Sequence, residues 1–250
     1  MIAQAVPDGR GSGEKGLSAF GLRELSRECE RRIVSALALQ PVALDSQFAS
    51  AAGSFKGVEI FLEARAYKGG AIAFARFVEL WGGALEIVNL LCLPCTNCAL
   101  PILGADLVSV SSQSAMFAAD LSPVPGFAAA PLLHAPHSLP SGGKLPDWCA
   151  RVLSPQPLRV RVEAGQRDEA GAAVLSRVDQ FCAIAKAGEH AGNRREIANA
   201  QREYGRAHLE DDKGLAMLGR IFGNEWAGRF LREVMFPAPL ETDDCNAAGE

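Results

Sequence analysis

An amide and a carboxyl side chain interrupt two neighbouring apolar segments of the sequence. Asn89 lies in the alternating segment 85–93, and Asp106 lies in the next one, 102–110. A hairpin centred on residues 97 and 98 would place the two side chains opposite each other, with their Cβ atoms ~5 Å apart. A buried carboxylate without a partner is costly, so we expect Asp106 to be protonated or hydrogen-bonded by Asn89. Asp106 is thus a candidate proton donor, unless the pair only satisfies backbone groups at an exposed sheet face.

A second group of polar residues lies in the predicted helical region near the C-terminus. Tyr204 and His208 are one helical turn apart, and Asp211 or Asp212 lies one turn further along. This row could face a ligand, or it could form an ordinary solvated helix face. Asp120 is followed by Leu-Ser-Pro, which favours a structural role at the end of a strand.

Two arginines share one face of the alternating segment 158–162. Arg159 and Arg161 are two residues apart, so their side chains point to the same side of a strand. That spacing could hold two carboxylate groups of a ligand. Two solvent-facing arginines would give the same pattern.

The cysteines do not define a strong metal site. Cys92, Cys95 and Cys98 form C-x2-C-x2-C, the spacing that begins a ferredoxin cluster site, but no fourth cysteine followed by proline lies downstream. Seven cysteines without a secretory context favour free thiols. The G-x-G-x-x-G at residues 11–16 has no strand before it, so it does not predict a nucleotide site.

The composition predicts a globular protein. Of 250 residues, 48% are hydrophobic and 22% are charged, which excludes a wholly disordered chain. The net charge of −4 argues against nucleic-acid binding by bulk charge. Polar residues interrupt the most apolar region, 84–110, and the N-terminus lacks the pattern of a signal peptide. We therefore expect no membrane span and a cytoplasmic location. We also expect a monomer, although no pattern in the sequence indicates the oligomeric state.

The hydrophobic periodicity predicts an α+β fold. A period of three to four indicates helices at 22–37 and 168–187 and in the region that follows, and a period of two indicates strands. The expected arrangement is a three-layer α/β/α sandwich with a central antiparallel sheet. One domain spans 17–236, between flexible tails at 1–16 and 237–250. The expected strands are 56–67, 71–80, 84–93, 101–110, 115–121 and 158–162.

Several motifs, in order and spacing, resemble the ferredoxin-dependent bilin reductases. Two of them contain the polar pair, namely Gly-Gly-Ala-Leu-Glu-Ile-Val-Asn89 and Leu-Pro-Ile-Leu-Gly-Ala-Asp106. The resemblance runs from about residue 55 to 236. The other matching segments are Ala-Asp-Leu-Ser-Pro at 119–123, Leu-Pro-Asp-Trp at 145–148, Tyr204 with Asp212-Lys213, Phe-Gly-Asn-Glu-Trp-Ala at 222–227, and Met235-Phe236.

This resemblance implies a reductase that binds the open-chain tetrapyrrole biliverdin IXα between the sheet and the C-terminal helices. It implies no bound flavin, metal or nicotinamide, and electrons that arrive singly from ferredoxin. Proton delivery to bilin radicals would then require carboxyl groups with a raised pKa. By position, Asp106 and Asp212 resemble the two catalytic aspartates of the family.

Two positions depart from the phycocyanobilin-forming members. Asn89 stands where they have a histidine, and Phe77 aligns with a glutamate that they use on the vinyl group. Asparagine at position 89 instead resembles the phycoerythrobilin-forming branch. The resemblance therefore favours reduction of biliverdin through 15,16-dihydrobiliverdin to phycoerythrobilin. Arg161 and Lys213 resemble contacts to the propionate groups, and His208 and Arg206 are further candidates for the binding pocket.

Other functions remain compatible with the sequence. A two-electron reductase could make or use 15,16-dihydrobiliverdin with the same residues, and a phycocyanobilin-forming reductase is a further alternative. A bilin-binding carrier would keep the pocket without transferring protons, although the two aspartates argue against it. An iron–sulfur protein is the remaining option.

Overall fold

The computed structural model describes residues 21–111, 113–127, 138–188, 191–210 and 213–239. The expected N-terminal tail, 1–16, lies outside these ranges, as does most of the expected C-terminal tail, 237–250.

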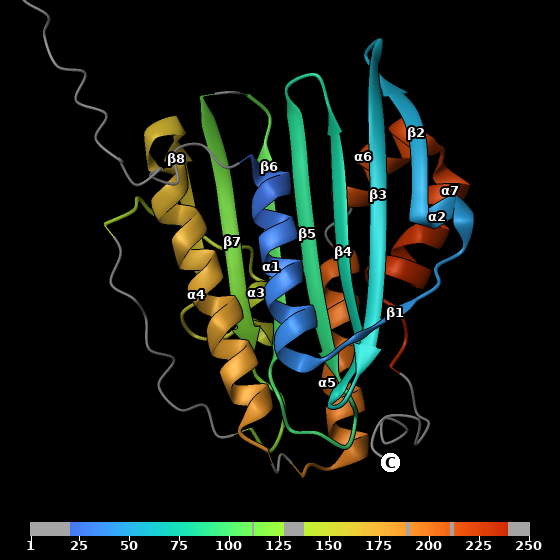
Figure 1. Ribbon diagram of the computed structural model, residues 1–250. Helices are drawn as coiled ribbons and strands as arrows, with labels where there is room; N and C mark the ends of the chain where they lie inside the picture. The colour runs from blue at the N-terminus through green and yellow to red at the C-terminus, as the bar shows by residue number, and fades with distance from the viewer. Residues whose placement is uncertain (1–20, 112, 128–137, 189–190, 211–212, 240–250) are drawn as a thin grey trace, which may run out of the picture.

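The core of the protein is one antiparallel sheet in which strands that are consecutive in sequence are mostly neighbours. Its order is β1-β3-β4-β5-β6-β7-β8, and β2 pairs with β3 beside β1 (Figure 1). All six expected strands are confirmed within a few residues. The strands are β1 Gln40–Val42, β2 Ser50–Phe55, β3 Val58–Gly69, β4 Ile72–Gly82, β5 Leu85–Pro94, β6 Ile102–Ser109, β7 Ser114–Ser122 and β8 Leu158–Glu163.

Strands β1 and β2 were not expected from the sequence. β1 has only three residues, and β2 is built from small residues that show little apolar contrast. The expected first strand began too early, at residue 56, because Lys56 and Gly57 form the turn between β2 and β3. Both have a positive φ, 51° and 79°, which suits a tight hairpin turn.

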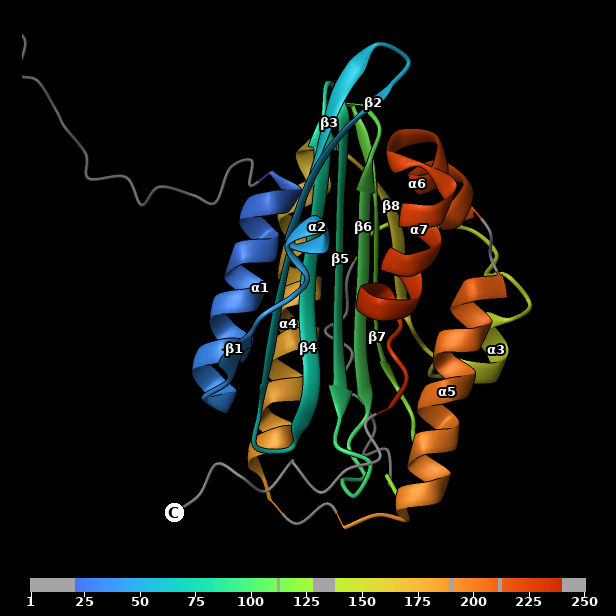
Figure 2. The same ribbon diagram turned by 90° about the vertical axis from the view of Figure 1, so that its right-hand side faces the viewer.

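Helices cover both faces of the sheet, which confirms the expected α+β sandwich (Figures 1 and 2). Helices α1 and α4 lie on one face, and α5, α6 and α7 lie on the other. None of the helices in the described ranges combines the length and apolarity that a membrane span requires. The helical segments are α1 Leu22–Leu37, α2 Ser46–Ala49, α3 Cys149–Val152, η1 Ala164–Gln166, α4 Arg167–Lys186, α5 Arg194–Glu210, α6 Lys213–Phe222, α7 Asn224–Phe230 and the π-helical turn η2 Leu231–Met235.

The two faces of the sheet differ in how completely they are covered. Under α1 and α4, side chains from β4 to β8 join one continuous apolar core, in which Phe77 and Leu103 are fully buried. The other face, which we call the site face, carries two separate apolar clusters. One joins β3 and β4 to α6 and α7, and the second joins β5 and β6 to α3 and α5. Between them, Asp106 is exposed, and Asn89 and Ala118 are partly exposed.

Helix α1 is held to the sheet by a buried carboxylate as well as by apolar packing. The Glu79 side chain on β4 has no solvent exposure, and it accepts hydrogen bonds from Arg23 and Arg27 of α1 and from Arg65 of β3. Burial alone raises the pKa of Glu79, but the hydrogen bonds from Arg27 and Arg65 outweigh it and hold the pKa below its ordinary value. The carboxylate is therefore charged in the folded protein at neutral pH.

Substitution Glu79→Gln should reduce the free energy of unfolding by about 3 kcal/mol, because it leaves three guanidinium groups around a neutral amide. Since the pKa of Glu79 is lower in the folded than in the unfolded chain, its stabilisation is complete above the usual glutamate pKa of about 4.3 and is lost as the pH falls below it. Urea unfolding of parent and variant should show that the difference in their free energies of unfolding becomes smaller as the pH is lowered from neutral to acidic.

The matched control is Glu28→Gln on the outer side of α1, where Glu28 accepts hydrogen bonds from Arg31 and Arg32 near solvent. Loss of that surface pair should cost only about 0.5 kcal/mol. Equal effects of the two substitutions would contradict the anchoring role of Glu79.

Candidate active site

The antiparallel register between β5 and β6 places Asn89 directly opposite Asp106, as the hairpin argument predicted. The Asn89 Nδ2 amide donates a hydrogen bond of 3.2 Å to Asp106 Oδ1. Both side chains lie on the site face, in the partly covered stretch between the two apolar clusters. The pair is thus accessible to a ligand.

The carboxyl group of Asp106 holds a proton more strongly than an ordinary aspartate. The surrounding protein raises its pKa by disfavouring the charged form, and this effect outweighs the hydrogen bond from Asn89 and the positive charge of Arg76. The side chain of Asp106 is also exposed to solvent, so a ligand can reach this carboxyl group. A reachable carboxyl group with a raised pKa is suited to general acid chemistry.

A buried arginine, which the sequence analysis missed, lies directly behind Asn89. Arg76 on β4 is only 1% exposed, and its Nη1 donates to Asn89 Oδ1 at 2.8 Å and to the Asn89 backbone oxygen at 3.3 Å. Its Nε donates to the backbone oxygen of Met235 at 2.8 Å. The signal in the sequence was a charged residue at an inward position of an apolar strand, on the face shared by Val78 and Leu80.

Tyr204 of α5 approaches the site over a glycine of β6. A Cβ atom on Gly104 would collide with the Tyr204 hydroxyl oxygen, so only glycine allows this approach. Gly104 is two residues from Asp106 on the same face of the strand. Burial and the nearby Asp120 raise the pKa of Tyr204, so its hydroxyl group stays protonated at neutral pH.

His208 lies one turn beyond Tyr204, within an aromatic cluster. Its ring centroid is 4.2 Å from that of Tyr204, 4.6 Å from that of Trp148 and 5.1 Å from that of Phe236. Its Nδ1 lies 2.8 Å from the backbone oxygen of Tyr204. His208 is half-buried beside the site, and its expected role in substrate binding stays a prediction.

The two arginines of β8 both lie on the site face, but they differ in their surroundings. The register across β7 places Arg159 opposite Ala118, which itself pairs with Asp106. Arg159 Nη1 donates to the backbone oxygens of residues 142, 143 and 144, so this guanidinium holds a loop in place. Within the described residues, the side chain of Arg161 makes no hydrogen bond or ion pair and is exposed. The expected role of Arg161 in substrate binding stays a prediction.

Of three other expected site residues, only Arg206 has a described side chain. Arg206 is exposed on α5 and forms ion pairs with Glu203 and Glu210, which gives no support to a contact with substrate. Asp212 and the side chain of Lys213 lie outside the described part of the chain.

The structure also shows what Asp120 and Phe77 do. Asp120 is buried and accepts hydrogen bonds from Ser122 and from the backbone and side chain of Ser154, which confirms a structural role at the strand end. Phe77 is fully buried in the core under α1 and α4 and therefore does not face the site. The residue of β4 that pairs with Asn89 is Val78. The glutamate expected from the resemblance at position 77 therefore has no counterpart on the site face at this residue, because side chains alternate along a strand.

The cysteines form no metal centre in the part of the chain that is described. No group of three or more His, Cys, Asp or Glu side chains is arranged there to hold a metal ion. Cys95, expected to be a free thiol, is instead disulfide-bonded. Among the described cysteines, those without a disulfide bond are Cys29, Cys92, Cys98, Cys149 and Cys182.

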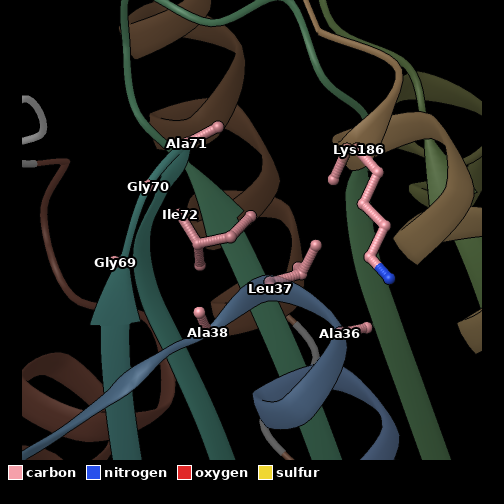
Figure 3. Close-up of a pocket in the computed structure, with 9 residues that line it drawn as sticks. Ala36, Leu37, Ala38, Gly69, Gly70, Ala71, Ile72 and Lys186 are labelled. Carbon is pink, nitrogen blue, oxygen red and sulfur yellow. The ribbon is translucent and has the colours of Figure 1, made fainter. Parts of the chain in front are cut away.

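A crevice of about 270 Å³ lies at the ends of α1 and α4, beside the turn between β3 and β4 (Figure 3). Its lining is mostly alanine, glycine and leucine, with Lys186 as the charged residue. It lies at the ends of the helices that cover the other face of the sheet, apart from Asn89 and Asp106, and is small for a tetrapyrrole.

The sequence profile described as "Ferredoxin-dependent bilin reductase" matches residues 26–237. The chain belongs to this family. Ferredoxin-dependent bilin reduction is therefore its chemistry.

Relatives of this bilin reductase are named after two different bilins. A phycocyanobilin:ferredoxin oxidoreductase from Prochlorococcus marinus strain MIT 9313 is 25% identical over 232 residues, which cover 88% of each chain. A phycoerythrobilin:ferredoxin oxidoreductase from strain MIT 9211 is 29% identical over 177 residues, covering 62% of this chain and 67% of the relative.

A solved structure has the same fold. The phytochromobilin synthase from tomato, crystallised in complex with biliverdin, matches this bilin reductase with a TM-score of 0.73 at 17% identity. The match covers 86% of this chain and 83% of the synthase.

Substitution Gly104→Ala should displace Tyr204, because the added methyl group occupies the position of its hydroxyl oxygen. The chain has two tyrosines, so NMR of ring-labelled tyrosine resolves each one. We expect the Tyr204 signal to shift and that of Tyr67 to stay unchanged. Gly165→Ala is the control, since nothing lies within 4 Å of a Cβ there. An unmoved Tyr204 signal in Gly104→Ala would contradict the close approach.

Proposed function

We propose that this bilin reductase converts biliverdin IXα through 15,16-dihydrobiliverdin to phycoerythrobilin. The first reduction, at the 15,16 bridge, consumes two electrons and two protons, and the second, at the A-ring diene, consumes two more of each. Reduced ferredoxin supplies the electrons one at a time, so protons are added to bilin radicals as well as to closed-shell intermediates. The protein's contribution is to bind the bilin and to place proton donors beside it.

The observation that carries this proposal is the hydrogen-bonded pair of Asn89 and Asp106 on an accessible face. An asparagine side chain does not titrate, so Asp106 is the member of this pair that can release a proton. Its raised pKa keeps a larger fraction of the carboxyl group protonated near neutral pH than an ordinary aspartate would.

The residues of the neighbouring strand, β4, favour reduction at positions of the bilin other than the D-ring vinyl group. Opposite Asn89, β4 presents Val78, which can neither donate nor accept a proton. The glutamate of that strand, Glu79, faces α1 and is bonded by arginines on the opposite side of the sheet. The resemblance assigned vinyl reduction to a glutamate on this strand, and no carboxyl group of β4 is available for it here.

Arg161 and Asp212 complete the proposal. Arg161 is exposed on the site face and suits a propionate group of the bilin. Asp212 is proposed as the second proton donor on the basis of the family resemblance, and Lys213 as a further propionate contact. Dihydrobiliverdin as the final product, or as the starting substrate, is the alternative that uses the same residues.

The product is tested by anaerobic incubation with biliverdin, ferredoxin, ferredoxin reductase and an NADPH-regenerating system, followed by chromatography against bilin standards. Phycoerythrobilin would support the proposal. Accumulated dihydrobiliverdin would indicate a two-electron enzyme, phycocyanobilin would contradict the argument from Asn89 and Val78, and bound but unreduced biliverdin would favour a carrier.

Substitution Asp106→Asn should preserve biliverdin binding and stop turnover, because the amide cannot release a proton to the reduced bilin. We expect a bilin radical to accumulate, detectable by electron paramagnetic resonance, and product formation to fall at least about 100-fold. Asp179→Asn, at an exposed ion pair with Arg32, is the control and should retain parental activity. Parental turnover in Asp106→Asn would remove Asp106 from the mechanism.

A further inference from the structure

We propose that Arg76 is a positioning residue that fixes the orientation of the Asn89 amide and thereby sets how Asp106 holds its proton. The proposal deepens the function assigned above, and it rests on the hydrogen bonds that connect Arg76, Asn89 and Asp106 in series.

The orientation of the Asn89 amide follows from the donors of Arg76. A guanidinium group has only N–H donors, so the Asn89 atom that faces it at 2.8 Å must be the oxygen. The NH₂ group is then directed at Asp106 Oδ1. Without Arg76, the amide could turn its oxygen towards Asp106. The oxygen would then accept a hydrogen bond from the protonated carboxyl group, whereas the NH₂ group donates one to the carboxylate that remains after the proton is released.

The same arrangement selects the oxygen of Asp106 that carries the proton. Oδ1 accepts the hydrogen bond from Asn89, which leaves Oδ2 as the better position for the proton. Within the described residues Oδ2 has no hydrogen-bond partner, and the side chain is exposed. The proton is thus held on the oxygen that a bound ligand can reach.

Arg76 is a buried cation whose direct partners are neutral. Its guanidinium donates to the backbone oxygens of Met235 and Asn89 and to the amide oxygen of Asn89, and it lies over the ring of Phe236. Burial lowers the pKa of Arg76 to about 10, so it stays charged at neutral pH. The positive charge therefore acts on Asp106 through the intervening amide and favours the carboxylate.

Other charged or titratable groups also surround Asp106. Tyr204 approaches from α5, Asp120 pairs with Gly104 on β7, and Arg161 shares the site face on β8. Arg76 differs from them because a continuous chain of hydrogen bonds joins it to Asp106.

The test is the pKa of Asp106 in the ligand-free protein, measured by NMR of ¹³C-carboxyl-labelled aspartate and assigned with Asp106→Asn. Substitution Arg76→Gln removes the charge and should raise this pKa by about one unit, a tenfold change in proton affinity. Arg76→Lys keeps the charge and should raise it less. Because no bilin is present, the result does not depend on whether the proposed product is correct.

The control is Arg177→Gln on α4. Arg177 is also buried and donates to a backbone oxygen, but α4 covers the opposite face of the sheet. The substitution Arg177→Gln should leave the pKa of Asp106 unchanged. An unchanged pKa in a folded Arg76→Gln variant, or an equal shift in Arg177→Gln, would overturn the proposal and leave Arg76 with a structural role only.

A second measurement needs no substitution of Arg76, which also holds Met235 and could be required for folding. In the parent protein, the side-chain NH₂ signals of Asn89 and the Nε–H signal of Arg76 should both titrate with the pKa of Asp106. Neither should titrate there in Asp106→Asn. An Arg76 signal that ignores the titration of Asp106 would contradict the coupling.

Discussion

The antiparallel register of β5 and β6 is the constraint on which the site depends. It brings an amide and a carboxyl group together on one face of a sheet whose neighbouring positions are apolar. A shift by one residue would turn Asp106 into the continuous core beneath α1 and α4, where a carboxylate would have no partner. The apolar residues on either side of Asn89 and Asp106 therefore fix the position of the polar pair.

The accessibility of the pair depends on the helices, which cover the two faces of the sheet differently. On one face α1 and α4 complete a continuous core, and the carboxylate of Glu79 is neutralised by arginines. On the site face the helices close only the two flanking clusters. Asp106 is therefore surrounded by enough protein to raise its pKa and remains open enough to meet a substrate.

Much of the architecture could be predicted because the core strands and long helices have clear periodicities. The same alternation predicted the pairing of Asn89 with Asp106, since the hairpin has no bulge between them. β1 and β2 lack such a signal, because one is very short and the other is built from small residues.

The parts of the site that come from distant segments could not be predicted in the same way. The guanidinium of Arg76 is held by a hydrogen bond to the backbone oxygen of Met235, which is far along the chain. The approach of Tyr204 to Gly104 depends on how α5 crosses the sheet. Phe77, which the resemblance matched to a glutamate of the phycocyanobilin-forming enzymes, lies in the core under α1 and α4, and the resemblance alone did not indicate on which side of the strand it lies.

The central claim is that the Asp106 carboxyl group protonates the reduced bilin. The most direct measurement is the decay rate of the bilin radical in an anaerobic single turnover, followed across a range of pH. The pKa of Asp106 is measured in the same biliverdin complex for comparison. The account predicts that the decay slows as the pH rises, with a midpoint at the pKa of Asp106, because only the protonated carboxyl group can donate. A decay rate that does not change across the titration of Asp106, or that has its midpoint elsewhere, would contradict it.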